Sequence, residues 1–332
     1  MRKDSFKSFQ NLLKKSSKIV IVTHFSPDGD AMGSSLGLHI FLKKLGKKTQ
    51  VIVPNAYPDF LHWLPDNNKV LIYDKNKLKA EKQLAQADLI FTLDFNSYKR
   101  LEGLGDAVAN SSATKVLIDH HQQPDDYASY YYYDTKACST CELVYDFIVG
   151  LNHKKLIDKK IAACLYTGLM TDTGSFRFPS VNAHTHEILA GLLETGLVPA
   201  DVHSAVYDSY SYDRLKLLGY ALSEKLKVID GYPVAYFTLT EKELNRFNYQ
   251  KGDTEGLVNY PFSIKGIKVC ALLNETDSYI KMSFRSKGKI DMNKFARSFF
   301  NGGGHINAAG GKSSESLAST EEKFITEIKK LF

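Results

Sequence analysis

The stretch KIVIVTHFSPDGDAMGSS, residues 18–35, decides the fold of this chain. It begins with a run of β-branched residues and passes into a polar loop with Pro and Gly, which predicts a buried strand followed by a turn. The loop leaves the carboxyl end of that strand, where open α/β sheets bind their ligands. It carries His24, Asp28 and Asp30. Because imidazole suits transition metals and carboxylates suit hard cations, this mixed donor set favours Mn²⁺ or a related ion.

Gly29 separates the two carboxylates of this loop and lets the backbone turn sharply between them. Asp28 and Asp30 can therefore face different cations, which lie about 3.5–4 Å apart in two-metal sites. The alternative is a polar turn in which Asp30 only caps the helix that follows.

Around this stretch, the first half of the chain alternates short apolar strands with amphipathic helices, as βαβ units of a parallel sheet do. We therefore predict an α/β fold with an N-terminal parallel sheet and helices on both of its faces. The expected strands are residues 18–23, 49–53, 88–93 and 115–118, with an edge strand of tyrosines at 130–133. The expected helices are residues 31–44, 77–87, 141–149, 158–170 and 184–194.

The pattern changes in the second half. Residues 200–227 place apolar side chains near helical spacing, which predicts a long helical connector. Further strands are expected at residues 232–239, 266–274 and 279–285, in a smaller α/β C-terminal domain. The predicted organisation is a metal-binding domain at 1–195, a helical linker at 196–227 and a second domain at 228–332.

Composition places the chain among soluble globular proteins, with 332 residues, 43% hydrophobic and 24% charged. The net charge of +6 favours anionic ligands but falls short of the basic tracts of duplex binders, so we expect no long duplex nucleic acid as a partner. The chain has few cysteines, no signal-like start and no apolar run of the ~20 residues that span a bilayer. We expect a cytoplasmic protein without a membrane partner, in which Cys138 and Cys141 are buried thiols at a helix start.

Six candidate metal ligands come from four separate segments, each at or just beyond the end of a predicted element. Four carboxylates can offset the charge of two divalent cations, and such cations act as Lewis acids and lower the pKa of bound water. Two adjacent histidines behind a buried strand are costly unless they are paired or metal-bound. Taken singly, Asp94 could be a cap and Asp172 a turn residue. The six candidates are His24, Asp28, Asp30, Asp94, His120 and Asp172, and His121 is left to contact substrate or protonate a leaving oxygen.

A second signal lies in the glycine-rich stretch NGGGHINAAGG, residues 301–311. Successive glycines can present backbone N–H groups to an anion, and we expect a helix to begin in the small residues that follow. Upstream, the run Ser283-Phe284-Arg285 ends a predicted strand with a guanidinium that can grip phosphate by two hydrogen bonds. The predicted substrate-binding residues are Ser283, Arg285, Gly302, Gly303, Gly304 and His305. The alternative for the glycines is a flexible surface loop.

With these motifs, the chain resembles the DHH-family phosphoesterases that carry a DHH-associated C-terminal domain, of the NrnA type. The resemblance covers nearly the whole chain. It implies that His24, Asp28 and Asp94 hold one Mn²⁺, that Asp94 bridges to a second, and that Mg²⁺ or Co²⁺ can substitute. The second ion would be held by Asp30, Asp94, His120 and Asp172. Ser26 stands where relatives often carry Asn, a departure that touches no ligand position.

The resemblance also implies a function: hydrolysis of short oligoribonucleotides to mononucleotides, and removal of the 3′-phosphate of 3′-phosphoadenosine 5′-phosphate. His121 and Asp94 would be the catalytic residues, and the partners would be short RNA or a mononucleotide bisphosphate. A homodimer is compatible with the sequence. Two alternatives remain: a phosphodiesterase for cyclic or linear dinucleotides, and a catalytically silent nucleotide- or RNA-binding module. A manganese pyrophosphatase is disfavoured by the glycine loop, and a long-strand exonuclease by the chain length.

Overall fold

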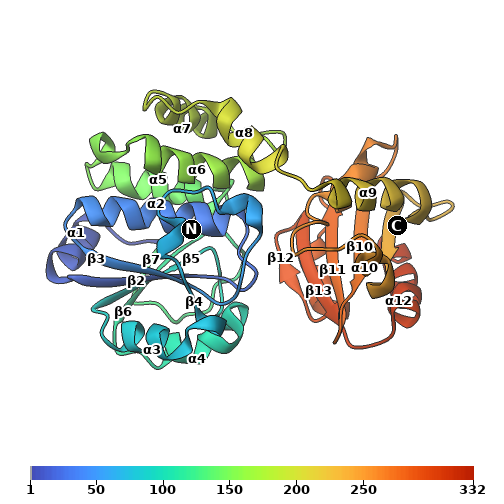
Figure 1. Cartoon of the computed structure of the whole chain (residues 1–332), viewed down its shortest axis with the longest axis horizontal. Helices are drawn as coiled ribbons and strands as arrows, with labels where there is room; N and C mark the ends of the chain where they lie inside the picture. The colour runs from blue at the N-terminus through green and yellow to red at the C-terminus, as the bar shows by residue number, and fades with distance from the viewer. Residues whose placement is uncertain (1) are drawn as a thin grey trace. The chain divides into compact units, whose positions relative to one another are not determined.

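The computed structural model describes residues 2–332, whose strands form two sheets in two separate units. The first unit extends to Ser209 and the second begins at Tyr210 (Figure 1). In the described part of the chain, no helix has the length and the apolar character needed to cross a membrane.

The sheet of the first unit has the strand order β1-β7-β6-β5-β2-β3-β4. Its six strands from β7 to β4 are parallel, which confirms the predicted parallel sheet. The tyrosine strand β7 is not at the edge, because β1 pairs with it in antiparallel orientation. The bounds are β1 (Arg2–Lys3), β2 (Lys18–Thr23), β3 (Lys48–Val53), β4 (Leu71–Ile72), β5 (Leu89–Leu93), β6 (Thr114–Asp119) and β7 (Tyr130–Tyr133).

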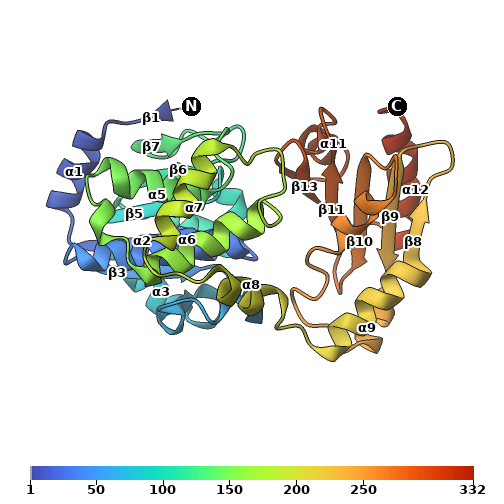
Figure 2. The same ribbon diagram turned by 90° about the horizontal axis from the view of Figure 1, so that it is seen from above.

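Helices cover both faces of this sheet because alternate strand residues point to opposite sides. Ile19 and Ile21 of β2 face one core, which includes side chains of α1, α2, α5 and α6, while Val20 and Val22 face the other, with α3 and α4 (Figure 1). Seen from above, α5 and α6 lie in front of the strands of this sheet (Figure 2). The bounds are α1 (Phe6–Lys15), α2 (Gly29–Lys44), α3 (Lys77–Ala85), α4 (Gly105–Ala109), α5 (Thr140–Gly150), α6 (Lys159–Asp172), α7 (Ala183–Leu193) and α8 (Pro199–Tyr207). Short 3-10 turns occur at Asp59–Leu61, Asn67–Lys69, Tyr73–Lys75, Tyr98–Leu104 and Lys154–Leu156.

Helix α2 packs very closely against α6, and three glycines at helical spacing of four make this possible. A Cβ atom on Gly33 would lie 2.4 Å from the carbonyl oxygen of Cys164. Cβ atoms on Gly29 and Gly37 would collide with the side chains of Thr171 and Leu165, also on α6. This set, Gly29, Gly33 and Gly37, is called the α2 glycine stripe below.

The second unit is built on a mixed sheet with the order β12-β13-β11-β10-β9-β8, in which only the pair β9 and β10 is parallel. Helices α11 and α12 lie on one face, and α9 and α10 contribute to the core on the other. The bounds are α9 (Tyr212–Tyr220), β8 (Leu226–Val228), β9 (Val234–Leu239), α10 (Glu241–Arg246), β10 (Val269–Glu275), β11 (Ile280–Ser286), α11 (Met292–Phe299), β12 (Gly303–Gly304), β13 (Ala308–Ser313) and α12 (Leu317–Lys329). A π-helical turn covers Ala221–Lys225, and a 3-10 turn covers Leu257–Ser263.

Two predictions for this region are wrong. The single helical connector is instead two helices, because the apolar residues of α8 join the first core and those of α9 join the second. The helix expected after the glycines is strand β13, which pairs with β11 and places Ala309 and Gly311 against Phe284 and its neighbours. The two units divide inside the segment 196–227, and the assignment of that segment as a linker stays a prediction.

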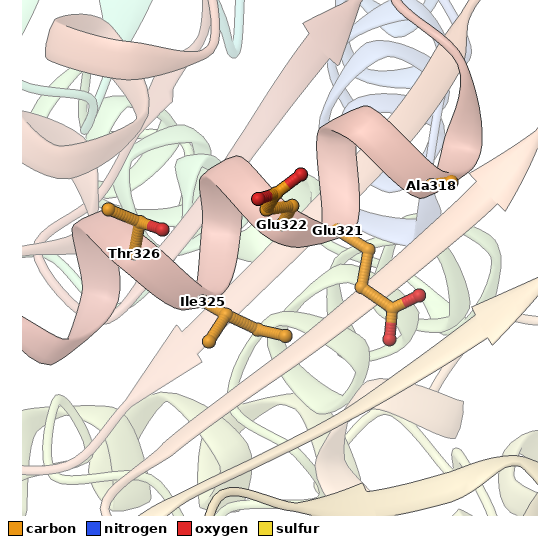
Figure 3. A pocket seen from close by; sticks show the side chains of 5 residues that line it. All are labelled: Ala318, Glu321, Glu322, Ile325 and Thr326. Carbon is orange, nitrogen blue, oxygen red and sulfur yellow. The ribbon is translucent and has the colours of Figure 1, made fainter.

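A shallow hollow of about 310 Å³ lies beside α12 of the second unit (Figure 3). Two of its five lining side chains are the carboxylates Glu321 and Glu322, and none of the five is a cation. Glu321 accepts hydrogen bonds from Lys227 and Tyr236. The hollow therefore does not suit an anionic ligand such as a phosphate ester.

Candidate metal centre

The structure brings the six candidate ligands of the first unit together at the carboxyl ends of its strands. They form two groups, within each of which the ligand atoms lie within 4.8 Å of one another. The first group is His24, Asp28 and Asp94, and the second is Asp30, His120 and Asp172. His24, Asp94 and His120 directly follow strands, Asp28 and Asp30 begin α2, and Asp172 ends α6.

In the first group, Nε2 of His24 lies 3.4 Å from Oδ2 of Asp94 and 3.8 Å from Oδ2 of Asp28. The other oxygen of Asp28 accepts hydrogen bonds from the backbone N–H groups of Asp30 and Ala31, each at 3.0 Å, and so caps α2. The residue that caps this helix is therefore Asp28, and the alternative that gave this role to Asp30 is wrong. Asp28 combines the two tasks, with one oxygen for the helix and one turned to His24.

In the second group, three carboxylates surround one imidazole nitrogen. Nε2 of His120 lies 3.7 Å from Asp30, 3.5 Å from Asp94 and 3.6 Å from Asp172. Asp30 is buried, and its two oxygens accept the backbone N–H groups of Thr140 at 2.6 Å and Cys141 at 2.9 Å. These N–H groups belong to the first turn of α5, where the helix dipole favours a negative charge.

Asp94 belongs to the first group and also faces His120 of the second group. Its Oδ2 faces His24 and its Oδ1 faces His120, so that the two oxygens of one carboxylate point toward two different imidazoles. Its backbone is in the left-handed region, with φ of 64°. Among residues with a side chain, Asp and Asn adopt this conformation most readily, and strained backbone of this kind clusters at functional sites.

The hydrogen bonds behind the imidazoles fit a metal. Nδ1 of His24 lies 2.9 Å from the carbonyl oxygen of Phe25, and Nδ1 of His120 lies 3.2 Å from that of Ala137. A carbonyl on one ring nitrogen holds the N–H there and turns the other nitrogen to the ligand position, as is typical of metal-ligating histidines. Two imidazoles and four carboxylates of this arrangement suit two divalent cations.

Without a cation, the same site holds protons. Burial lowers the pKa of His24, but hydrogen bonds and charge from Asp28 and Asp94 outweigh it and raise that pKa to about 10. The pKa of His120 is likewise raised well above its usual value against burial, by Asp94, Asp172 and Asp30. Burial and the charges of Asp94 and Asp172 raise the pKa of Asp30. In the metal-free protein these protons offset part of the negative charge of the carboxylates, as bound divalent cations would.

His121 is held by a different carboxylate. Its Nδ1 lies 2.8 Å from Oδ1 of Asp119, a fully buried residue at the end of β6, and 3.6 Å from Oδ1 of Asp94. Burial, together with the nearby charge of Arg100, lowers the pKa of His121 well below its usual value, so the ring is neutral at pH 7. Burial raises the pKa of Asp119 to about 6. Asp119 thus fixes the tautomer of His121, a role that sequence reasoning missed although the two residues are only two positions apart in the sequence.

Four of the predicted substrate-binding residues lie on two strands of the second unit, Ser283 and Arg285 on β11 and Gly303 and Gly304 on β12, with β13 between the two strands; Gly302 and His305 flank β12. Ser283 and Arg285 of β11 pair with Gly310 and Ala308 of β13, which in turn pairs with the glycines of β12. The expected array of N–H groups available to an anion is wrong for Gly302, Gly304 and His305, whose N–H groups donate within the protein, that of His305 to the carbonyl of Ala308. The N–H of Gly302 donates to the carbonyl of Ala296, and the N–H of Gly304 donates to Oδ1 of Asn293. His305 follows directly on β12.

Comparison with known proteins gives a consistent result. Residues 18–169 match the model of the DHH family, N-terminal domain, and residues 231–332 match the model of the DHHA1 domain. The probable bifunctional oligoribonuclease and PAP phosphatase NrnA of Streptococcus mutans is 31% identical, over 98% of this chain and 99% of the relative. The bifunctional oligoribonuclease and PAP phosphatase NrnA of Bacillus subtilis is 27% identical, over 88% of each chain. The crystal structure of an exopolyphosphatase-related protein from Bacteroides fragilis is similar with a TM-score of 0.92 and 43% identity, covering 98% of this chain and 95% of that one.

Proposed function

This chain belongs to the DHH family of metal-dependent phosphoesterases, and from this premise we propose that it hydrolyses short oligoribonucleotides to mononucleotides and removes the 3′-phosphate of 3′-phosphoadenosine 5′-phosphate. The relatives named for these two activities match it over most of both chains. The observation that carries the proposal is the position of Asp94, whose two oxygens face the imidazoles of two separate ligand groups.

We assign the ligands as follows. His24, Asp28 and Asp94 hold one divalent cation, and Asp30, Asp94, His120 and Asp172 hold the other, in accord with the two groups of donor atoms. Mn²⁺ suits this mixture of imidazole and carboxylate, and Mg²⁺ or Co²⁺ are substitutes. When bound, such cations polarise phosphoryl oxygens and lower the pKa of water to near neutral.

The residues of the chain orient the substrate and move its protons. His121, held in one tautomer by Asp119, contacts the scissile phosphate, and the negative charge of that phosphate raises the pKa of the ring toward a value at which it can protonate the leaving oxygen. In the second unit, Arg285 grips phosphate with its planar fork, and Ser283 of the same strand, the glycines of β12 and the adjacent residues Gly302 and His305 complete the binding surface. Contacts to phosphate carry no base information, so we expect little base specificity.

The test is a substrate panel with the purified full-length protein and Mn²⁺. A linear diribonucleotide and 3′-phosphoadenosine 5′-phosphate are expected to be hydrolysed, and a long oligonucleotide to be a poor substrate. Faster turnover of cyclic diadenylate than of both expected substrates would assign the protein to second-messenger turnover instead. No release of phosphate or mononucleotide from any of them, with Mn²⁺ bound, would make it a binding module and overturn the proposal.

A further inference from the structure

The first turn of α5 touches both carboxylates at the centre of the proposed metal site. Beside the backbone hydrogen bonds to Asp30, the side chain of Thr140 donates its hydroxyl proton to Oδ1 of Asp94 at 2.9 Å. Thr140 is fully buried. A hydroxyl has one proton to donate, so this proton is committed to the carboxylate.

The helix itself does not need this hydroxyl. Ser139 is the N-cap of α5, and its side-chain oxygen accepts the backbone N–H of Glu142 at 3.1 Å. Thr140 is the next residue, and its side chain leaves the helix for Asp94, a residue 46 positions earlier in the chain. The hydroxyl of Thr140 thus contacts a residue of the proposed metal site rather than its own helix, which indicates a role at that site.

The contact determines how the Asp94 carboxylate is turned. Rotation of this group about its terminal bond is soft, because such torsions have broad minima. With Oδ1 held by Thr140, Oδ1 lies 3.5 Å from His120 and Oδ2 lies 3.4 Å from His24. Without the hydroxyl, Oδ1 loses a hydrogen bond that comes from a residue outside the proposed ligand set.

We infer that Thr140 is a positioning residue that orients the Asp94 carboxylate so that it can serve both cations at once. This inference rests on the proposed function, since it assumes a pair of cations. It predicts that the side-chain hydroxyl of Thr140, and not its bulk, controls the affinity for the pair.

The experiment measures Mn²⁺ binding by titration calorimetry and the electron paramagnetic resonance spectrum of the Mn²⁺-loaded protein. Thr140→Val keeps the shape and the backbone N–H but loses the hydroxyl. We expect about 10–100-fold weaker binding of at least one ion, as for other groups that hold metal ligands, and replacement of the spin-coupled signal of an ion pair by that of isolated Mn²⁺. Thr140→Ser restores the donor and is expected to restore both readouts.

Thr167→Val is the matched control. Thr167 is also buried, but its hydroxyl donates to the carbonyl of Ala163 within its own helix α6 and contacts none of the six proposed ligands. This variant is expected to bind Mn²⁺ as the wild type does. If the Thr140→Val protein does not fold, Thr140→Ala, which cannot overpack the site, is used with the same expectation.

Wild-type binding and a spin-coupled spectrum in the Thr140→Val protein would overturn the inference while leaving the proposed function intact. An equal loss in Thr140→Ser would overturn it as well, because the hydroxyl is then present. If the wild-type protein binds no pair of Mn²⁺ ions, the proposed function fails first, and this result is distinguishable from the other two.

Discussion

At the scale of single residues, Asp94 combines three properties that are seldom found together: burial, a left-handed backbone and two oxygens that face different imidazoles. Asn tolerates the same backbone conformation but carries no charge. Asp94→Asn is therefore expected to fold, to lose at least one Mn²⁺ in titration calorimetry, and to lower kcat on a diribonucleotide by at least about 10²-fold, the usual loss for one electrostatic group.

Asp74→Asn is the control for that variant, because Asp74 is exposed and lies in the 3-10 turn before α3. It is expected to keep wild-type kcat and metal content. An Asp94→Asn protein that holds both ions and turns over at the wild-type rate would contradict the bridging role.

Proton release on metal binding follows from the raised pKa of His24. In the metal-free protein this pKa is about 10, so the ring is charged at pH 7, and it must lose its proton to bind a cation. We expect Mn²⁺ affinity to increase with pH up to about 10, with proton release visible as a buffer-dependent enthalpy in calorimetry. For the metal-free protein, the contribution of His24 to the free energy of unfolding is complete below its unfolded pKa of 6.5 and is lost as the pH increases through about 10. An Mn²⁺ affinity that does not change between pH 6 and pH 9 would contradict the expected release of the His24 proton.

Ser26 also has a left-handed backbone, with φ of 56°, and its N–H donates to Oδ1 of Asn55. Asn adopts this backbone conformation more readily than Ser does. Ser26→Asn is expected to raise the free energy of unfolding by about 0.5–1 kcal/mol, measured by urea unfolding. Ser298→Asn, on the exposed side of α11, is expected to change it by less than about 0.5 kcal/mol. A destabilised Ser26→Asn protein would contradict the argument.

At the scale of elements, the α2 glycine stripe allows a close contact between α2 and α6. Gly33→Ala places a methyl group against the backbone of α6, 2.4 Å from the carbonyl oxygen of Cys164, where no flexible side chain can move away. We expect the free energy of unfolding to fall by about 1–3 kcal/mol or more, as for other overpacked cores. Gly219→Ala, at an exposed position of α9 with open space around it, is expected to raise it by up to about 1 kcal/mol. Equal effects of the two changes would contradict the packing argument.

The elements that could be predicted from the sequence are those with a strong local pattern. The β-branched strand at residues 18–23 and the helix that follows it are confirmed, because periodicity and the loop residues agree. The glycine-rich segment was predicted to start a helix, but pairing with β11 makes it a strand, and strand pairing between distant residues leaves no local pattern. Strand β1, with two residues, is too short to show any period, so the edge position of the tyrosine strand was wrong.

The candidate site likewise contains residues that could be predicted from the sequence and one that could not. The six candidate ligands of the first unit lie close together, because polar residues at strand ends converge on one edge of a parallel sheet, and their assignment to two cations stays a prediction. Thr140 could not be found in this way. Its proposed role depends on the direction of one hydroxyl in the first turn of a helix, and no residue spacing in the sequence reveals that direction.

At the scale of the whole molecule, the two units have separate cores, so a ligand of the first is expected to stabilise that unit alone. The single tryptophan, Trp63, lies in the first unit and makes its unfolding visible by fluorescence. We expect Mn²⁺ to raise, and a chelator to lower, the Tm of the fluorescence transition by several degrees, since about 1 kcal/mol shifts Tm by roughly 2–4 °C in domains of this size. A shift of the same size in circular dichroism signals of the second unit, or none in fluorescence, would contradict this.

The α2 glycine stripe has a further consequence at the same scale. Asp28 and Asp30 lie at the start of α2, and Asp172 lies at the end of α6, so we expect the distance between these two helices to set the size of the proposed cation site. Mg²⁺ takes oxygen at about 2.0–2.1 Å and Ca²⁺ at about 2.3–2.6 Å, a difference smaller than the displacement that one methyl group imposes between helices. The three glycines of the stripe are therefore expected to influence which cation the proposed site accepts, although none of them is a proposed ligand.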